Sequence, residues 1–259
     1  MSQPPPVRCE LADGIAFLTL DRPARRNALS SEMLQALKDH LGRIAEDPHA
    51  RVVILRAAGP VFSAGHDLGE VESATEDELR ALFALCTEVM EGVRLLPKPV
   101  IAQVHGLATA AGCQLVASCD LVVASEQAAF ATPGVKIGLF CTTPGVALSR
   151  AVGAKKALEM LFTGTPISAQ EAERAGLVNR VVPHGQLEEA ALDLARRILA
   201  ASPRVLAAGK SAFHAQLPLD RAAAYGLAEP AMVRGAQAPE AREGIRAFLE
   251  KRPPRWPEG

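Results

Sequence analysis

The strongest constraint on the fold is an alternation of short apolar runs with amphipathic helical patterns along the first half of the chain. Residues 7–11 and 14–20 are apolar runs that meet at Ala12-Asp13-Gly14, and Asp-Gly between such runs predicts a hairpin. Ser30 then caps a predicted helix whose apolar residues recur at helical spacing. Further strands are predicted at 51–57, 99–104 and 120–125, with helices at 75–96 and 110–119 between them. This alternation predicts an α/β architecture.

From about Gly145 the pattern becomes mostly helical. Helices are predicted at 155–162, 168–176, 186–201, 203–215, 219–234 and 239–252, with one strand at 178–182. No Gly/Ser-rich or Pro-rich linker divides the two regions. We therefore expect an α/β core at residues 1–195 and a C-terminal helical region at 196–259. The Leu and Ala faces of that region could bury against another subunit of a homo-oligomer.

The composition indicates an ordinary globular protein. Of the 259 residues, 49% are hydrophobic and 22% are charged, with a formal net charge of -1. Nucleic acid is not expected as a partner, because binding to its phosphate backbone needs a basic excess. No apolar run reaches the roughly 18 to 20 residues of a membrane-spanning helix, so no membrane partner is expected. The first residues lack the pattern of a signal or transit peptide, and we expect a cytoplasmic protein.

Several common catalytic and metal-binding patterns are absent from the sequence. There is no P-loop, no HExxH, no GxSxG and no GxGxxG after a strand, and the five cysteines form no CxxC pair. These absences argue against nucleotide hydrolysis, zinc hydrolysis, Ser-triad chemistry and dinucleotide redox chemistry. No metal or redox cofactor is expected.

Two glycine-bearing turns between a strand and a helix remain, at residues 59–70 and 105–114. Each leaves backbone N–H groups free at a turn or a helix start, where the helix dipole also favours negative charge. Two such groups that converge on one oxygen would form an oxyanion hole. The alternative is that the small residues serve only close packing.

The motifs at these turns are similar to those of the crotonase (enoyl-CoA hydratase/isomerase) superfamily. The resemblance rests on FSAGHDL at 62–68, IAQVHGLATAAGCQLVASCDLVVAS at 101–125, FATPGVKIGL at 130–139, TGTPISAQEAERAGLVNRVV at 163–182 and EGIRAFLEKR at 243–252. It implies a spiral core of ββα units, a C-terminal helical region used for trimerisation, and a trimer or a dimer of trimers. It also implies that an acyl-CoA thioester binds, with coenzyme A as part of the substrate and no separate cofactor.

The resemblance assigns roles to four positions. The oxyanion donors match the backbone N–H groups of His66 and Ala111. Typical hydratases of the family carry two catalytic glutamates, and the matching residues here are Gln114 and Gly134. An amide can hydrogen-bond but cannot act as a base, and glycine has no side chain. Because the loss of one general base costs typically about a hundredfold to ten-thousandfold, ordinary hydration is expected to be weak or absent.

Other residues match the family's substrate-binding positions. These are Arg25, Asn27, Ala28 and Leu29 along the coenzyme A groove, Ala64, Asp67 and Leu68 at the first turn, Cys141 beside the acyl pocket, and Phe248 and Lys251 near the nucleotide. A helix cap is the alternative role for Asp67, and a buried inert thiol is the alternative for Cys141.

Three functions stay open at this point. The motifs AAGCQLVASCD, FATPGV and GLFCTTPGVAL resemble those of the enoyl-CoA hydratase domain-containing protein 3 subgroup. This resemblance favours a nominal hydratase/isomerase. The FSAGHD turn also resembles methylmalonyl-CoA decarboxylases of the superfamily, although that subgroup has a tyrosine where Cys141 stands and a glutamate at Gln114. A non-catalytic acyl-CoA binder is the third possibility. The side chain of His66 could itself have a chemical role, because imidazole titrates near neutral pH.

Overall fold

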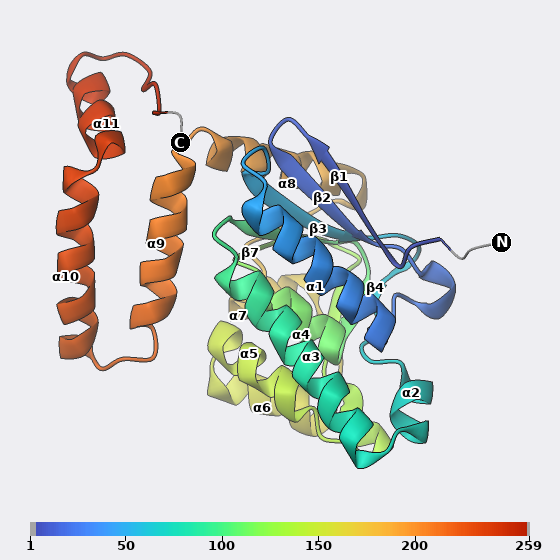
Figure 1. Cartoon of the computed structure of the whole chain (residues 1–259). Coiled ribbons are helices and arrows are strands. Elements are labelled where there is room, and N and C mark those ends of the chain that lie inside the picture. Colours follow the sequence, from blue (N-terminus) through green and yellow to red (C-terminus); the bar gives the residue numbers. More distant parts are fainter. Residues whose placement is uncertain (1–3, 258–259) are drawn as a thin grey trace.

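A computed structural model describes residues 4–257 and arranges them as two sheets surrounded by helices (Figure 1). The strands are β1 (Val7–Ala12), β2 (Ile15–Leu20), β3 (Val52–Ala57), β4 (Val61–Ser63), β5 (Val100–Val104), β6 (Leu107–Thr109), β7 (Leu121–Ser125), β8 (Ala129–Ala131), β9 (Ile167–Ser168) and β10 (Arg180–Val182). The α-helices are α1 (Ser31–Glu46), α2 (Leu68–Ser73), α3 (Glu76–Leu95), α4 (Ala111–Ser118), α5 (Thr142–Val152), α6 (Ala154–Thr163), α7 (Ala169–Ala175), α8 (Leu187–Leu199), α9 (Pro203–Gln216), α10 (Arg221–Gln237) and α11 (Pro239–Leu249). Short 3-10 helices lie at η1 (Pro23–Arg25), η2 (Pro133–Ile137) and η3 (His184–Gln186).

The hairpin predicted at Asp13-Gly14 is confirmed. Strands β1 and β2 pair antiparallel, with Ala12 opposite Ile15. Asp13 and Gly14 both have positive φ, 50° and 79°, which suits the tight turns whose twist matches that of the paired strands. All other pairs of the large sheet are parallel, and their strands lie in the order β2, β3, β5, β7 and β10.

A second sheet, of order β4-β6-β8-β9, was not predicted. Its strands contain only two or three residues each, too few for an alternating pattern to be visible in the sequence. Strands β4, β6 and β8 follow directly on β3, β5 and β7 of the large sheet, and a helical segment follows each pair. This repetition is the spiral of ββα units that the resemblance implies. The expected α/β fold class is therefore confirmed.

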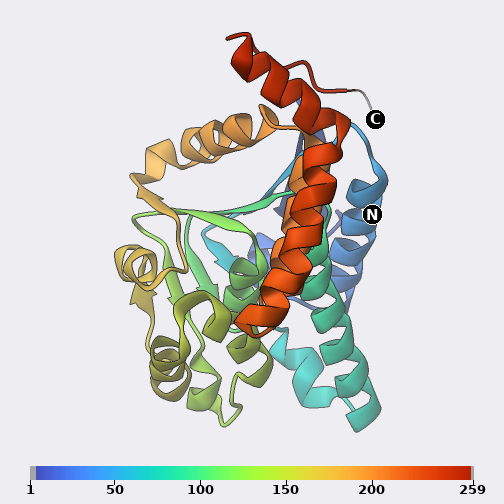
Figure 2. The same cartoon turned by 90° about the vertical axis from the view of Figure 1, so that its left-hand side faces the viewer.

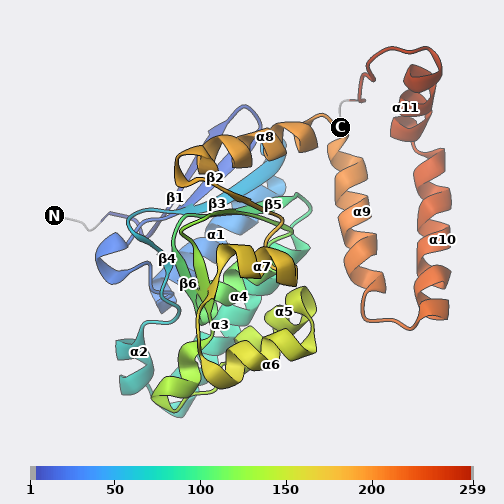
Figure 3. The same cartoon turned by 180° about the vertical axis from the view of Figure 1, so that it is seen from behind.

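The large sheet is covered on both faces. One face packs on α1 and α3, whose buried residues include Met33, Leu37 and Val89. The other face, from Ile54 and Val123, packs on α8, which lies in front of the sheet in the view of Figure 3. The expected division of the chain at residue 195 falls within α8, and that division stays a prediction.

Helices α9, α10 and α11 form an arm that stands apart from the two sheets, as Figures 1 and 3 show. The arm exposes large apolar side chains, among them Val205, Phe213, Tyr225, Met232, Val233, Ile245, Phe248 and Leu249. Such a surface is unusual for a monomer in water and marks an interaction face. Among residues 4–257, none of the helices combines the length and apolar character needed to cross a bilayer.

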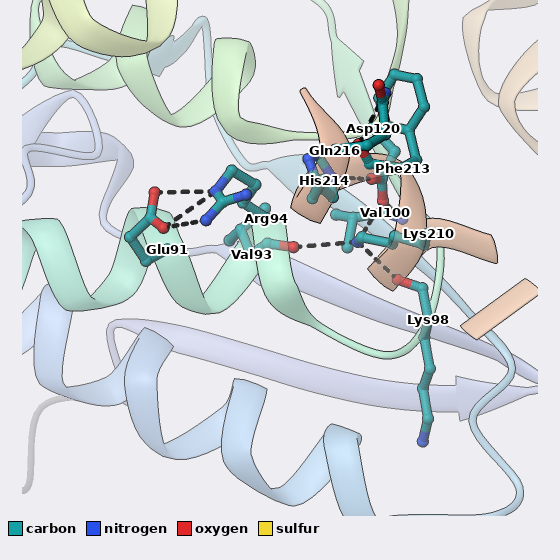
Figure 4. Close-up of polar contacts among 10 residues, drawn as sticks. All are labelled: Glu91, Val93, Arg94, Lys98, Val100, Asp120, Lys210, Phe213, His214 and Gln216. Atoms are coloured by element: carbon teal, nitrogen blue, oxygen red, sulfur yellow. Dashed lines mark hydrogen bonds and ion pairs between the residues drawn. The ribbon is translucent and has the colours of Figure 1, made fainter. Parts of the chain in front are cut away.

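The arm is anchored to the core by a nearly buried ammonium group, Lys210 Nζ on α9 (Figure 4). It donates to Asp120 Oδ2 at 2.6 Å, to the carbonyl of Lys98 at 3.1 Å and to the carbonyl of Val93 at 3.3 Å. An ammonium has three donors, so all three are used. Val93 lies in the last turn of α3, where a cation also interacts favourably with the helix dipole. His214, one turn further along α9, lies 3.7 Å from the other carboxylate oxygen of Asp120.

The substitution Lys210→Met should test this anchor, because it keeps the apolar stem of the side chain and removes the charge. Removing one partner of a fully buried ion pair costs about 3 to 5 kcal/mol. Because the side chains of Lys210 and Asp120 are 10% and 19% exposed, we expect a smaller loss of about 2 kcal/mol in the free energy of unfolding, measured with urea. The matched control is Lys155→Met at an exposed position of α6, expected to stay within about 0.5 kcal/mol of wild type. Equal losses in the two variants would contradict the anchor.

Candidate functional site

The two glycine-bearing turns identified in the sequence are in direct contact. Gly65 has φ 86°, a left-handed conformation that favours glycine. A Cβ at this position would lie 2.8 Å from Ala110 Cβ and 3.2 Å from the backbone nitrogen of Ala111. Gly112 is similarly constrained, since a Cβ there would lie 2.7 Å from Ser63 Cβ. The absence of these side chains lets the turn after β4 and the start of α4 come together.

Residues 26–29 hold the first turn in place. Leu29 N–H donates to the carbonyl of Gly65 at 2.7 Å, and Ala64 N–H donates to the carbonyl of Arg26 at 3.0 Å. The hydroxyl of Ser63 donates to the carbonyl of Asn27 at 2.9 Å. Ala28, partly buried, and Leu29, fully buried, thus lie directly beside the turn.

The side chain of Asn27 is occupied by the protein. It is fully buried, its carbonyl accepts the N–H of Arg22 at 2.9 Å, and its amide donates to the carbonyls of Ala58 and Val61 at 2.8 and 2.9 Å. These bonds join the 22–29 segment to the loop before β4 and to the first residue of that strand. The side chain of Asn27, one of the residues expected along the coenzyme A groove, therefore holds the shape of the turn.

The backbone N–H groups of His66 and Ala111 are the free donors at this contact. Ala111 is the first residue of α4, where the N–H groups of the first turn have no partner within the helix. Among the hydrogen bonds of residues 4–257, none has either N–H as its donor. The positive end of the helix dipole lies at the same place. The arrangement can stabilise a negative charge that develops on an oxygen.

Ala110, which precedes α4, has a strained backbone. Its φ of 51° and ψ of -120° lie in a region that glycine occupies readily and alanine does not. The conformation is held at both ends, because Ala110 N–H donates to the carbonyl of Ala131 at 2.9 Å and its carbonyl accepts the N–H of Gln114 at 3.0 Å. Strain of this kind costs about 1 to 3 kcal/mol and is often found at functional sites.

Gln114 lies within α4 and is only 5% exposed. Its Oε1 atom is buried and has no hydrogen-bond partner in the described part of the chain. Leaving a buried polar atom unpaired costs about 1 to 3 kcal/mol, so such an atom calls for a partner such as water or a ligand. The hydroxyl of Thr132, also buried and unpaired, was not identified from the sequence, where a lone threonine before Pro-Gly carries no signal.

Gly134 and Cys141 form a closed turn. Gly134 N–H donates to Cys141 Sγ at 3.3 Å, and the Gly134 carbonyl accepts the N–H of Leu139 at 3.0 Å. A Cβ at position 134 would overlap with the Leu139 carbonyl oxygen and would lie 2.7 Å from Cys141 Sγ. The turn in this conformation has no room for a glutamate at position 134. Burial raises the pKa of the Cys141 thiol, which favours the protonated form.

Asp67 is the cap of α2, as its position at a helix start predicts. Its Oδ1 accepts the N–H of Gly69 at 3.0 Å, and Arg25 lies 3.7 Å from its other oxygen. Arg25 itself is exposed, and Leu68, which follows Asp67 in the chain, is 55% exposed. Both are accessible to a ligand at the edge of the turn.

Phe248 and Lys251 are not brought to this site within one chain. Phe248 is 82% exposed on α11, and Lys251 follows that helix. All three views place α11 at the upper end of the arm, away from α2 and α4, which lie lower in the core (Figures 1, 2 and 3).

The chain is similar to known proteins along nearly its whole length. A family model described as enoyl-CoA hydratase/isomerase matches residues 10–259. Enoyl-CoA hydratase domain-containing protein 3, mitochondrial, is 52% identical in Rattus norvegicus and 51% identical in Homo sapiens, over 98% of this chain and 85% and 84% of those proteins. The crystal structure of an enoyl-CoA hydratase from Mycobacterium smegmatis has a TM-score of 0.95 and 48% identity, covering 98% of this chain and 99% of that one. The structure of the human domain-containing protein 3 has a TM-score of 0.94 and 51% identity, covering 97% and 100%.

These similarities confirm the resemblance to the superfamily and to the domain-containing protein 3 subgroup. They also correct the expected compartment. The cytoplasmic expectation is wrong, because relatives at 51 to 52% identity are named as mitochondrial proteins. That expectation rested on the composition of the first residues, which does not determine the compartment.

The strain at Ala110 predicts that Ala110→Gly stabilises the protein. Glycine adopts the observed φ and ψ without the steric cost, and the larger entropy of its unfolded state offsets only part of this gain. We expect the free energy of unfolding to rise by about 1 kcal/mol. Ala117→Gly, in the regular part of α4, is the control and should lower it by about 1 kcal/mol. A loss in both variants would show that Ala110 is not strained in solution.

The crowding at Gly134 predicts that even Gly134→Ala destabilises the protein, by about 2 kcal/mol in thermal or urea unfolding. Gly209→Ala, at an open position on α9, serves as the reference and should be neutral or stabilising by up to about 1 kcal/mol. A Gly134→Ala protein as stable as wild type would mean that the 134–141 turn opens readily.

Proposed function

The chain belongs to the enoyl-CoA hydratase/isomerase family, and from that premise we propose that it binds an acyl-CoA thioester with the carbonyl oxygen between the N–H groups of His66 and Ala111. The observation that carries this proposal is the contact between Gly65 and the start of α4, with free backbone donors on both sides. Polarising the thioester carbonyl lowers the free energy of an enolate, the anion that the chemistry of the family generates. Coenzyme A enters as part of the substrate, and the proposal includes no separate cofactor.

Arg25 and its neighbours provide the charge expected for coenzyme A. Arg25 is exposed beside the first turn, and Arg26 next to it is exposed as well. Guanidinium groups suit phosphate, which they bind through paired hydrogen bonds. In this proposal Ala28, Ala64 and Leu68 line the path from that phosphate region to the thioester, and the fully buried Leu29 supports this path from within the protein.

The protein is proposed to act as a homo-oligomer, a trimer or a dimer of trimers. The apolar face of the arm supports this, because its side chains are exposed in the single chain. Phe248 and Lys251 would then complete the coenzyme A site of a neighbouring copy. Light scattering of the purified protein at several concentrations tests the assembly.

The nominal activity, hydration of enoyl-CoA, is proposed to be weak. The amide of Gln114 can orient water or an acyl oxygen, but it cannot take a proton, and the turn at Gly134 is closed against a glutamate. The alternative of malonyl-type decarboxylation gains no support from the site. Where that subgroup has a tyrosine and a glutamate, this chain has Cys141, whose sulfur accepts a hydrogen bond from Gly134, and Gln114, whose buried oxygen is unpaired.

We expect turnover of crotonyl-CoA and longer enoyl-CoAs at least about 100-fold below that of an ordinary hydratase, while calorimetry detects acyl-CoA binding. Gln114→Glu restores a titratable group on α4 and should raise hydration at least about tenfold over wild type. Gln114→Leu, of similar size and without polar atoms, is the control and should not raise it. Wild-type turnover within tenfold of an ordinary hydratase would contradict the argument from the two replaced positions.

A panel of acyl-CoAs read by mass spectrometry separates the candidate functions. Loss of CO2 from methylmalonyl-CoA or ethylmalonyl-CoA would identify a decarboxylase. Binding without turnover or proton exchange would identify a non-catalytic binder. Absence of binding to every acyl-CoA would overturn the proposed function itself.

A further inference from the structure

The imidazole of His66 is held in a single tautomer. Its Nδ1 atom lies 3.2 Å from the carbonyl oxygen of Leu29. A carbonyl oxygen can only accept a hydrogen bond, so Nδ1 carries the proton and donates it. In the neutral ring the other nitrogen, Nε2, then has a free lone pair.

That lone pair has no partner in the described part of the chain. Nε2 of His66 is buried, and none of the side-chain or backbone donors of residues 4–257 bonds to it. The ring packs edge-on against Phe83 of α3, with 5.3 Å between the ring centroids, so it is held by this contact and by the bond to Leu29. A rigid, buried acceptor without a donor is costly in a native protein, and its partner has to come from water or from a ligand.

The carboxylates beside the ring are engaged in the structure of the turn. Asp67 caps α2 through Gly69 N–H. Glu70 accepts the N–H and the hydroxyl of Ser31 at 2.9 and 3.1 Å. Both carboxylates therefore already accept hydrogen bonds from the protein. His66 instead presents an uncommitted titratable atom at this turn.

We propose that Nε2 of His66 is the acid–base group of this site and exchanges a proton with the carbon next to the thioester carbonyl. This assignment rests on the proposed acyl-CoA binding. The backbone N–H of the same residue is one of the two donors to the thioester oxygen, and a short covalent path joins it to Nε2. The imidazole thus supplies, from a different element, one acid–base group at a site where Gln114 and Gly134 supply none.

Nε2 takes a proton from the α-carbon, and the electron pair of the broken C–H bond forms a double bond to the carbonyl carbon. The carbonyl π pair moves to the oxygen, where the N–H groups of His66 and Ala111 stabilise it. The imidazolium, with its Nδ1–H still bonded to Leu29, returns the proton to the same carbon or exchanges it with solvent.

The surroundings of the ring favour its neutral form before the reaction. Burial lowers the pKa of His66, an effect opposed by the Leu29 carbonyl and by the negative charge of Glu70. The contact from α3 is with the uncharged Phe83, and the nearby Arg25 pairs with Asp67. At neutral pH the ring is therefore a base ready to accept a proton.

The test is the exchange of α-protons of butyryl-CoA in D2O, followed by mass spectrometry in wild type and in His66→Asn. Asparagine keeps the backbone N–H and can donate to Leu29 in place of Nδ1, but it has no group at the position of Nε2. We expect butyryl-CoA affinity within about threefold of wild type and exchange slower by at least about 100-fold. The wild-type rate should fall as the pH drops through the pKa of the ring, and the variant should lose this dependence.

His66→Gln provides a second variant, because its amide reaches the position of Nε2 and cannot take a proton; it should behave as His66→Asn. His49→Asn at an exposed position is the matched control and should exchange at the wild-type rate. Exchange in His66→Asn within threefold of wild type, or binding by wild type without exchange, would overturn this assignment and leave the proposed binding intact. If wild type binds no acyl-CoA, the proposed function fails, and the assignment fails with it.

Discussion

The close approach of Gly65 to Ala110 and Ala111 is the contact on which the rest of the site depends. Because neither Gly65 nor Gly112 carries a side chain, the turn after β4 can lie directly on the start of α4. The 26–29 segment then fastens the turn from the other side through backbone hydrogen bonds. The donors at this site belong to the main chain, so their position depends on the fold and only weakly on which side chains surround them. This separates the binding of a carbonyl oxygen from the choice of reaction.

The fold could be predicted from the sequence where patterns are long. Strands β3, β5 and β7, helix α3 and the helices of the arm all lie where the periodicity of the sequence predicts them. The small sheet could not be predicted, because strands of two or three residues show no period. For the site, the two turns were visible as glycine-bearing stretches, and motif similarity assigned roles to His66, Ala111 and Gln114.

Other features of the site depend on contacts between distant residues, which have no local signal. The bond from His66 to Leu29 and the packing of its ring on Phe83 join three separate elements. The closed turn at Gly134 depends on Cys141 and Leu139 adopting one particular backbone path. The sequence shows that position 134 has no side chain, and only the structure shows that it has no room for one.

The anchor between Lys210 and Asp120 has a consequence for folding during synthesis. The two residues are 90 positions apart, and Asp120 lies between α4 and β7, in the middle of the spiral. Domains fold as units while the chain emerges from the ribosome, N-terminal parts first. The core strands up to β10 can therefore assemble while the carboxylate of Asp120 still lacks its cation. The carbonyl groups at the end of α3 and the carboxylate before β7 gain the ammonium group as a hydrogen-bond partner only when α9 has left the exit tunnel. The arm is synthesised last and therefore completes the polar contacts of a core that is synthesised first.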